Sequence, residues 1–242
     1  HVQGRVTSPG GNKKGTGGLF GRICGATITA CSADVDIESG EDYVGGLFGY
    51  DTAPSVVSDC WTTGKVKGNS KVGGIGGGFI KAESAMYNCF STMEVEGSFQ
   101  VAGILGHANL DQNNANADND PKNRVESCIA WNTSIAATPT DGGEHYSSGI
   151  IVGFTALKNY LVNNYHKAGI SFAECPKNTE LGYKAYDQEN SSPASPLVHG
   201  ANNYDFAYHG KTAAASATIS TLAQTLNWSE SVWDLSGDVP VL

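Results

Sequence analysis

The feature that most constrains the fold of this chain is an internal repeat built on a short glycine-rich motif. Each copy places one to three apolar residues between glycines or other small residues. The copies, which we call glycine knots, are residues 17–21, 45–49, 73–77, 102–106 and 148–153. The first three steps between knots are 28, 28 and 29 residues, and insertions at 109–123 and 138–146 lengthen the fourth. A period of this size predicts stacked, similar turns, because an insertion can leave and re-enter its own turn as a loop.

A cysteine recurs at one place in the repeat, and an alternating segment follows it. The cysteine positions are Cys31, Cys60, Cys89 and Cys128, with Asn164 in the fifth copy. Alternation with a period of two is typical of a β-strand with one buried face. With cysteine taken as inward, the other inward residues are Ala33, Val35 and Ile37, then Thr62, Gly64 and Val66, then Ser91, Met93 and Val95. All charged residues of these segments then fall on the outer face.

The charges provide a separate indication of how the turns stack. Aligned on cysteine, Asp36, Lys65 and Glu94 form one column, and Glu38, Lys67 and Glu96 form the next. Both columns read acid, base, acid, so each lysine lies between two carboxylates. Opposite charges on neighbouring strands contribute about 0.2 to 1 kcal/mol per pair. We therefore expect parallel strands stacked in register, since a hairpin sandwich would not place these residues side by side.

The composition favours short strands separated by turns and excludes several classes of protein. Of the 242 residues, 31 are glycine, which weakens helices and supplies the backbone angles that turns need. The net charge is −9, with only three arginines, which argues against nucleic-acid binding. No apolar run approaches the roughly 20 residues of a membrane-spanning helix. Residues 1–6 lack the pattern of a secretory signal peptide.

The spacing of the cysteines favours free thiols, although six cysteines would allow three disulfides. The four recurring cysteines would form a buried column, and Cys24 and Cys175 lie outside it. Stacked neighbours about 4.8 Å apart are close enough for a disulfide, but their parallel Cα–Cβ bonds suit one poorly. We also expect no metal site and no cofactor, because there is no close Cys-x-x-Cys pair and no histidine pair at helical spacing.

The two ends of the chain differ from the central repeats. Residues 2–6 resemble residues 64–68, so we expect the chain to begin partway through a turn, with further repeats or domains of the same polypeptide upstream. The fourth and fifth copies lose the charge pattern, and residues 202–204 echo residues 163–165, which suggests a last partial turn.

The C-terminal region has the pattern of a cap. Residues 218–226 have the apolar spacing of a short helix, with Thr218 or Ser220 as its N-cap. Trp228 and Trp233 follow, and we expect them to pack on the last turn. The chain is thus divided into repeats at 1–175 and a partial turn with a capping segment at 176–242. The predicted fold is all-β: a right-handed parallel β-helix of about five turns, closed by a cap that contains a short helix.

Two segments carry a resemblance to a known family. The unit of Val44–Gly49 followed by Cys60–Gly68 resembles the GLUG repeat of bacterial surface proteins. The ending at residues 226–242 resembles the closing segment of such arrays in Bacteroides-type gut bacteria. The resemblance covers residues 1–175 as repeats and 218–242 as a terminator. It implies an extracellular protein of the cell surface with an adhesive or architectural role, and it brings no catalytic residues.

The residue after each cysteine position is the candidate binding surface. In three copies it is aromatic, Trp61, Phe90 and Tyr165, and by the parity argument it points outward. A stripe of aromatic rings can stack on sugar rings, because each ring offers a flat apolar face with little entropy to lose. The competing interpretation is that residues 176–217 lie across the stripe and bury it, since exposed apolar stripes of this size are uncommon.

Other kinds of site receive less support from the sequence. The insertion at 111–120 has the oxygen ligands that calcium prefers, but it lacks the spacing of an EF-hand and is more typical of a solvated loop. No glycine knot is followed by the Gly-Lys-Ser/Thr of a phosphate-binding loop. None of the histidines 107, 145, 166, 199 and 209 forms a recognisable triad with Ser and Asp. We therefore expect no catalytic activity.

The function that these features favour is an extracellular surface adhesion or scaffold module. Its partner would be a glycan or a protein of a host or cell surface. The main alternative is a carbohydrate-binding module that uses the aromatic stripe. A polysaccharide-degrading β-helix enzyme is a further alternative, although the regular acidic residues are already matched by lysines.

Overall fold

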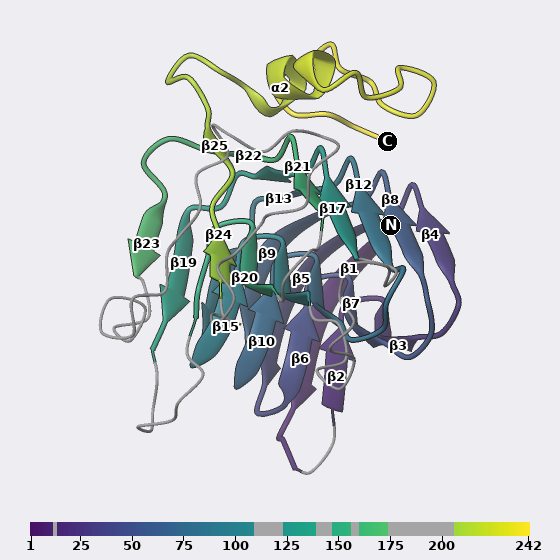
Figure 1. Ribbon diagram of the computed structural model, residues 1–242, viewed down its shortest axis with the longest axis vertical. Helices are drawn as coiled ribbons and strands as arrows, with labels where there is room; N and C mark the ends of the chain where they lie inside the picture. Colours follow the sequence, from purple (N-terminus) through teal and green to yellow (C-terminus); the bar gives the residue numbers. More distant parts are fainter. Residues whose placement is uncertain (12–13, 109–122, 139–146, 156–159, 174–205) are drawn as a thin grey trace, which may run out of the picture.

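The computed structural model describes residues 1–11, 14–108, 123–138, 147–155, 160–173 and 206–242, which form mainly parallel strands in four sheets (Figure 1). Sheet A contains β1 (Val2–Ser8), β5 (Ser32–Ser39), β9 (Trp61–Lys67), β13 (Phe90–Ser91), β14 (Glu94–Gly97), β18 (Ile129–Ala130), β19 (Ser134–Ala137), β22 (Tyr165–His166), β23 (Ser171–Ala173) and β25 (Lys211–Thr212). Sheet B contains β2 (Lys14–Gly17), β6 (Asp42–Gly45), β10 (Ser70–Gly73) and β15 (Phe99–Ala102). Sheet C contains β3 (Phe20–Ile23), β7 (Phe48–Asp51), β11 (Gly76–Phe79), β16 (Leu105–Ala108), β20 (Val152–Thr155) and β24 (Phe206–Tyr208). Sheet D contains β4 (Thr27–Thr29), β8 (Val56–Ser58), β12 (Ala85–Tyr87), β17 (Arg124–Glu126) and β21 (Tyr160–Val162).

The chain passes through the four sheets in the same order in successive turns. After β5 it forms β6, β7 and β8, one strand in each of the other sheets, and then returns to sheet A as β9. Each strand therefore pairs with its counterpart one repeat later, as Ala33 of β5 does with Thr62 of β9. The pairings between these strands are parallel, except that β24 runs antiparallel to β20. The prediction of an all-β chain with parallel strands is confirmed.

Alternation in the sequence correctly separates the two faces of sheet A. The predicted inward residues Ala33, Val35, Ile37, Thr62, Val66, Ser91, Met93 and Val95 are buried, and Gly64 is half-buried. They join the inward residues of the other sheets in one apolar core along the stack. Burial of a Val or Ile side chain stabilises a fold by about 1.5 to 3 kcal/mol, so the stack is held together mainly from within.

The glycine knots form the corner between sheets B and C. In the second knot the Gly46 N–H donates to the Gly74 carbonyl at 3.1 Å, and the Leu47 N–H donates to the Ile75 carbonyl at 2.8 Å. A Cβ on Gly46 would collide with the Gly74 carbonyl oxygen and the sulfur of Met93. Only glycine allows successive corners to approach this closely. The knots thus contribute to backbone packing.

The recurring cysteines line the corner between sheets D and A. The residue before each of Cys31, Cys60, Cys89 and Cys128 has left-handed backbone, with φ from 51° to 55°. The Cys60 thiol donates to the Ser58 carbonyl at 3.0 Å and so closes this turn. The five cysteines in the described part of the chain are free thiols, as predicted, and Cys175 lies outside it. Cys31 is only half-buried, because β1 begins opposite Ala33 and leaves it without a neighbour on that side.

Asn164 takes over the role of cysteine in the fifth copy. Its side-chain Nδ2 donates to the Val125 carbonyl at 2.9 Å, and its Oδ1 accepts from the Cys128 N–H at 2.9 Å. An amide can therefore close the same left-handed corner that a thiol closes elsewhere. The fifth turn keeps its parallel pairing as a result, with Tyr165 opposite Ile129.

The first strand, β1, lies in sheet A and pairs with β5 from Val2 opposite Ala33 to Ser8 opposite Ser39. In β1, Val6 pairs with Ile37, which pairs in turn with Val66. Residues 2–6 therefore correspond to residues 62–66, and the predicted equivalence with residues 64–68 is wrong by two residues, because Gly4 lies opposite Val35, which lies opposite Gly64. At the other end β25 extends sheet A in parallel with β22. The partial turn predicted at 202–204 and the domain boundary predicted at 175/176 lie outside the described residues.

The C-terminal segment forms the predicted short helix, α2 (Ile219–Thr225), beside the strands (Figure 1). Thr218 is its N-cap: the Thr218 side chain accepts from the Thr221 N–H at 3.1 Å, and the Thr221 hydroxyl accepts from the Thr218 N–H at 2.9 Å. The expectation that Trp228 and Trp233 pack on the last turn is wrong. They pack on the outer face of sheet A, against Phe90. The predicted aromatic stripe, which we call the aromatic row, lies on this face, and the core does not cover its rings.

Candidate functional site

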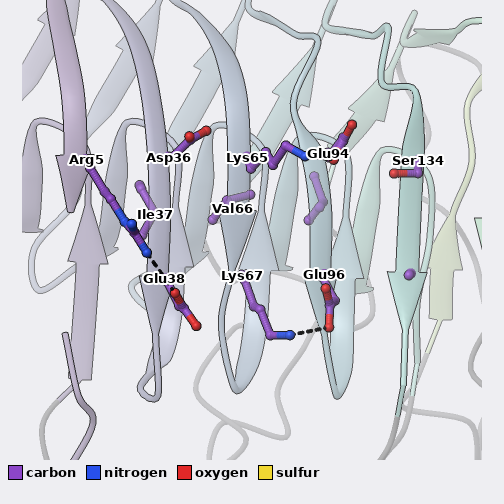
Figure 2. Close-up of a pocket in the computed structure, with 12 residues that line it drawn as sticks. Arg5, Asp36, Ile37, Glu38, Lys65, Val66, Lys67, Glu94, Glu96 and Ser134 are labelled. Atoms are coloured by element: carbon purple, nitrogen blue, oxygen red, sulfur yellow. Dashed lines mark hydrogen bonds and ion pairs between the residues drawn. The ribbon is translucent and has the colours of Figure 1, made fainter. Parts of the chain in front are cut away.

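The outer face of sheet A carries the predicted columns of charge. Lys65 pairs in register with Asp36 on one side and with Glu94 on the other. The Lys65 Nζ lies 2.9 Å from a Glu94 carboxylate oxygen, and the Lys67 Nζ lies 2.7 Å from one of Glu96. Figure 2 shows these side chains spread across neighbouring strands. The alternating columns deduced from the sequence are therefore present.

The ion pairs on this face run mainly in one direction. Each lysine contacts the acid of the following turn, while Glu38 accepts instead from Arg5, whose guanidinium lies 3.2 Å away. The hydrogen bond that Lys65 donates to Glu94, and then the charge of Glu94, raise the pKa of Lys65. These side chains are about half or more exposed, and exposed pairs are screened by water. Their effect is to organise the surface more than to stabilise the fold.

The charged side chains line an open groove of about 520 Å³. It runs across strands β1, β5, β9, β14 and β19, and it ends where Ser134 and Ala136 replace the charged residues of the columns. The groove carries carboxylates and ammonium groups at a regular strand spacing of about 4.8 Å. Such a surface suits a repetitive polar partner that spans several turns. Its exposed, mutually paired acids have no buried position from which to act as general acid or base.

The aromatic row is present and in register, but it is largely covered. Trp61 pairs with Phe90, Phe90 with Ile129, and Ile129 with Tyr165. The rings of Trp61 and Phe90 stack 5.8 Å apart at an angle of 6°. Phe90 is only 1% exposed, because Trp233 packs on it at 5.8 Å. Trp61, Phe90 and Tyr165 therefore do not form one open platform for a glycan.

The cover over this row consists of residues between 213 and 235. Trp228 donates its indole N–H to the Ser127 carbonyl at 3.1 Å, and Trp233 donates to the Asp59 carboxylate at 3.1 Å. Both acceptors belong to left-handed residues of the cysteine corner. The sequence had suggested residues 176–217 as the cover. Of those, Ala213 and Ala217 belong to the same apolar cluster as Phe90, while residues 176–205 lie outside the described part.

Two rings at the edges of the cover stay half-exposed. Trp61 lies beside His1, with ring centroids 5.9 Å apart. Tyr165 has the Lys211 ammonium over its ring at 5.9 Å. A glycan site on this row remains a prediction, and Trp61 and Tyr165 are the members of the predicted set that a ligand could reach without displacing the cover.

A second cluster, missed at the sequence level, lies outside the core where sheets B and C meet. His107 on β16 stacks on Phe154 at 4.9 Å, and its Nδ1 lies 3.0 Å from the Gln100 side-chain oxygen. Burial, with a smaller effect of the Lys71 charge, lowers the pKa of His107 to about 3. Burial, with nearby acidic charges, raises the pKa of Tyr43 to about 12. Shifted pKa values in one cluster make it a candidate for chemistry.

The backbone explains why these side chains gather. Tyr43, Lys71 and Gln100 occupy the same place in three successive repeats, two residues before a knot, and all three have left-handed backbone with φ from 54° to 60°. The sequence does show this shared position. The sequence does not predict that His107 packs against this position. His107 lies in sheet C and the shared position lies in sheet B, and alternation along one strand does not relate residues of different sheets.

A third buried polar group, the Asp51 carboxylate, lies at the corner between sheets C and D. The Asp51 side chain accepts from the backbone N–H groups of Ile80 and Lys81, at 2.6 and 3.1 Å, and from the Ser84 hydroxyl at 2.5 Å. Burial raises the pKa of Asp51, against these hydrogen bonds, which lower it. Ser84 continues the network through its N–H to Asn123. This arrangement satisfies the backbone of a corner and leaves no free acceptor pointing at solvent.

Several other predicted positions can now be placed. His166 contacts the Thr212 hydroxyl at 3.0 Å, and His209 accepts from the Ile150 N–H at 3.1 Å, so both join the turns. His145, His199 and the acidic insertion at 111–120 lie outside the described residues. Within the described part, no three His, Cys, Asp or Glu side chains gather as metal ligands would. In that same part, no helix has the length and apolar character to cross a membrane.

Comparison with known proteins does not identify a function, so the candidate site is interpreted from its geometry. No protein-family model, curated protein or solved structure matches this chain significantly.

Proposed function

We propose that this chain is a right-handed parallel β-helix that acts as an extracellular surface adhesion or scaffold module, related to the GLUG-repeat proteins that its sequence resembles. The repeated order of sheets A to D supports the helical path, and parallel strands joined by crossovers are right-handed in nearly all known cases. Stacks of this kind bind along a face, where equivalent residues of successive turns line up.

The observation that carries this proposal is the open charged groove on sheet A. Its ionic side chains come from consecutive turns and are spaced by the strand repeat. They are exposed and paired with each other, so they can exchange partners with a polar ligand at little cost in desolvation. A long, regular and solvated face suits attachment to an extended partner better than it suits catalysis on one bond. We therefore propose no catalytic role.

Binding to surfaces tests the proposal directly. The purified protein is applied to immobilised host-cell surface proteins and glycans, beside a variant in which Arg5, Lys65 and Lys67 are replaced by Gln. The control is Lys81→Gln, which removes an exposed charge away from the groove. We expect binding that the triple variant loses and the control keeps, with both variants folded by circular dichroism. Equal binding of the two variants, or cleavage of a bound polysaccharide, would contradict the proposal.

Location is tested separately in a bacterium that produces the protein. Antibody labelling of intact cells, compared with lysed cells, reports whether the chain is exposed outside. We expect intact cells to be labelled. Labelling that appears only after lysis would refute the extracellular part of the proposal.

A carbohydrate-binding module is the second candidate, favoured by the flat, half-exposed ring of Trp61. The neighbouring Phe90 ring supports it from behind in a parallel stack. On a glycan array, Trp61→Ala should abolish binding while the protein keeps its melting temperature within a few degrees. Phe90→Ala is not a clean test, because Phe90 is buried under the cap. An array without signal for the parent protein would dismiss this candidate.

A further inference from the structure

Lys71 and Asp42 bring an amine and a carboxylate together between two neighbouring strands of sheet B. Lys71 lies on β10 and Asp42 on β6, where the pairing places Ser70 directly opposite Asp42. The Lys71 Nζ is 3.9 Å from Oδ2 of Asp42. The left-handed backbone of Lys71, with φ of 56°, belongs to the regular corner geometry and therefore holds this residue in one conformation.

Ser70 links the two groups through its hydroxyl. The Lys71 Nζ donates to the Ser70 Oγ at 3.3 Å, and the Ser70 Oγ donates to Oδ1 of Asp42 at 2.5 Å. Asn69 also donates to Oδ1, from its side-chain amide at 2.9 Å. Oδ1 thus has two hydrogen-bond donors that stabilise negative charge on it, while Oδ2 faces the amine.

The surroundings of Lys71 are apolar on two sides. The ammonium lies 5.0 Å from the centre of the Tyr43 ring and 5.3 Å from that of Phe99. The side chain of Lys71 is 17% exposed and that of Asp42 is 31% exposed. Burial lowers the pKa of Lys71, although the charge of Asp42 raises it. A larger share of Lys71 is therefore the neutral, nucleophilic amine than for a lysine in water.

The exposed ion pairs of sheet A provide an internal comparison. Lys65 and Glu94 are closer to each other, at 2.9 Å, but they are 65% and 48% exposed. The hydrogen bond to Glu94 raises the pKa of Lys65, and a charged ammonium does not attack a carboxylate. The distinguishing features of Lys71 and Asp42 are the hydroxyl that bridges them and the rings that exclude water.

We propose that Lys71 and Asp42 condense into an intramolecular isopeptide bond that joins β6 to β10. Proton transfer from the ammonium to Oδ2 of Asp42, the oxygen that faces it, first gives an amine and a carboxylic acid, while Ser70 keeps its hydrogen bond to Oδ1. The Nζ lone pair then attacks Cγ of Asp42, with negative charge developing on Oδ1 beside Ser70 and Asn69. The bond from Cγ to Oδ2 breaks, and Oδ2 leaves as water with two protons that were on nitrogen. One positive and one negative charge disappear together, and no oxidant is required.

The folded structure supplies what the reaction lacks in solution. Two groups held in contact behave as if at very high concentration, which offsets the entropy cost of their meeting. The product would lock the second and third turns together at a position that the core does not reach. Because the readout below is a mass, this inference succeeds or fails independently of the proposed function.

Intact-protein mass spectrometry tests the bond on the whole chain, both freshly purified and after prolonged incubation at neutral pH. We expect a mass lower than the sequence mass by one water molecule, and a proteolytic fragment in which the peptides containing residues 42 and 71 are joined. A mass equal to the sequence mass after incubation, with the two peptides recovered separately, would overturn the proposal.

Matched variants identify the groups involved. Lys71→Arg and Asp42→Ala should each restore the full mass, and Ser70→Ala should slow the loss of water at least several-fold. Lys65→Arg is the control and should lose water as the parent does. Loss of water that persists in Lys71→Arg would place the modification elsewhere and refute the assignment.

Discussion

Acidification below pH 6.5 should destabilise this protein through His107. The imidazole is 6% exposed, stacked on Phe154 and bonded to Gln100. Its pKa falls from 6.5 to about 3 on folding. The folded protein therefore holds the ring neutral over a range in which the unfolded chain protonates it. The stability that depends on the neutral ring is complete above pH 6.5 and is lost as the pH falls toward 3.

The size of the effect follows from linkage between protonation and folding. With these two pKa values, the free energy of unfolding falls by about 2 kcal/mol between pH 7 and pH 5. This interval lies well above the folded pKa, so the result depends mainly on the value in the unfolded chain. Tyr43 and Lys71 face the ring; burial raises the pKa of Tyr43 to about 12 and lowers the pKa of Lys71. Asp51 acts in the opposite direction, because its pKa is raised by burial.

A comparison with His107→Gln isolates the contribution of the ring. Glutamine is neutral at every pH and can still hydrogen-bond to Gln100. Urea unfolding, followed by tryptophan fluorescence at pH 8, 7, 6 and 5, gives the free energy of unfolding of both proteins. We expect the parent protein to lose about 2 kcal/mol more than the variant between pH 7 and 5. The same pH dependence in both proteins, or an imidazole that titrates near 6.5 in the folded protein by NMR, would refute the reasoning.

Three further changes test the packing of the turns. Replacing Lys65 and Lys67 together by Glu leaves the columns wholly acidic, so the melting temperature should fall, most at low salt; an unchanged value would count against the electrostatic role of the columns. Gly46→Ala should cost at least about 2 kcal/mol in urea unfolding, whereas Gly237→Ala, where the nearest atom to an added Cβ is 3.7 Å away, should be neutral. Trp233→Phe keeps the ring over Phe90 but removes its hydrogen bond to Asp59, and should cost about 1 kcal/mol in urea unfolding; full stability would show that the bond is dispensable.

Much of the candidate surface on sheet A was accessible from the sequence. The charge columns follow from two local facts, a fixed repeat length and alternation along each strand. In a stack of in-register turns, residues at the same place in the repeat become neighbours, so that Asp36, Lys65 and Glu94 align by their numbering alone. The same reasoning explains why the recurring cysteines form a buried column and why the glycine knots stack on one another at successive corners.

The burial of the aromatic row could not be predicted in this way. Parity correctly turns Phe90 away from the core, but it does not say what covers that side. The cover comes from Trp228 and Trp233, more than a hundred residues later in the chain. Both tryptophans lie in a segment without the repeat, so no period relates them to the strands on which they pack.

The sequence by itself determined the parallel stacking, the register of the central turns and the inward face, because each of these follows from a period that those turns share. The tertiary structure alone decided which outward residues stay exposed, and it alone brought His107 to Tyr43 and Lys71 to Asp42 through Ser70. Those contacts depend on the left-handed backbone before each knot and on the close approach of sheets B and C. They are set by the three-dimensional path of the corners, and side-chain alternation along one strand carries no information about them.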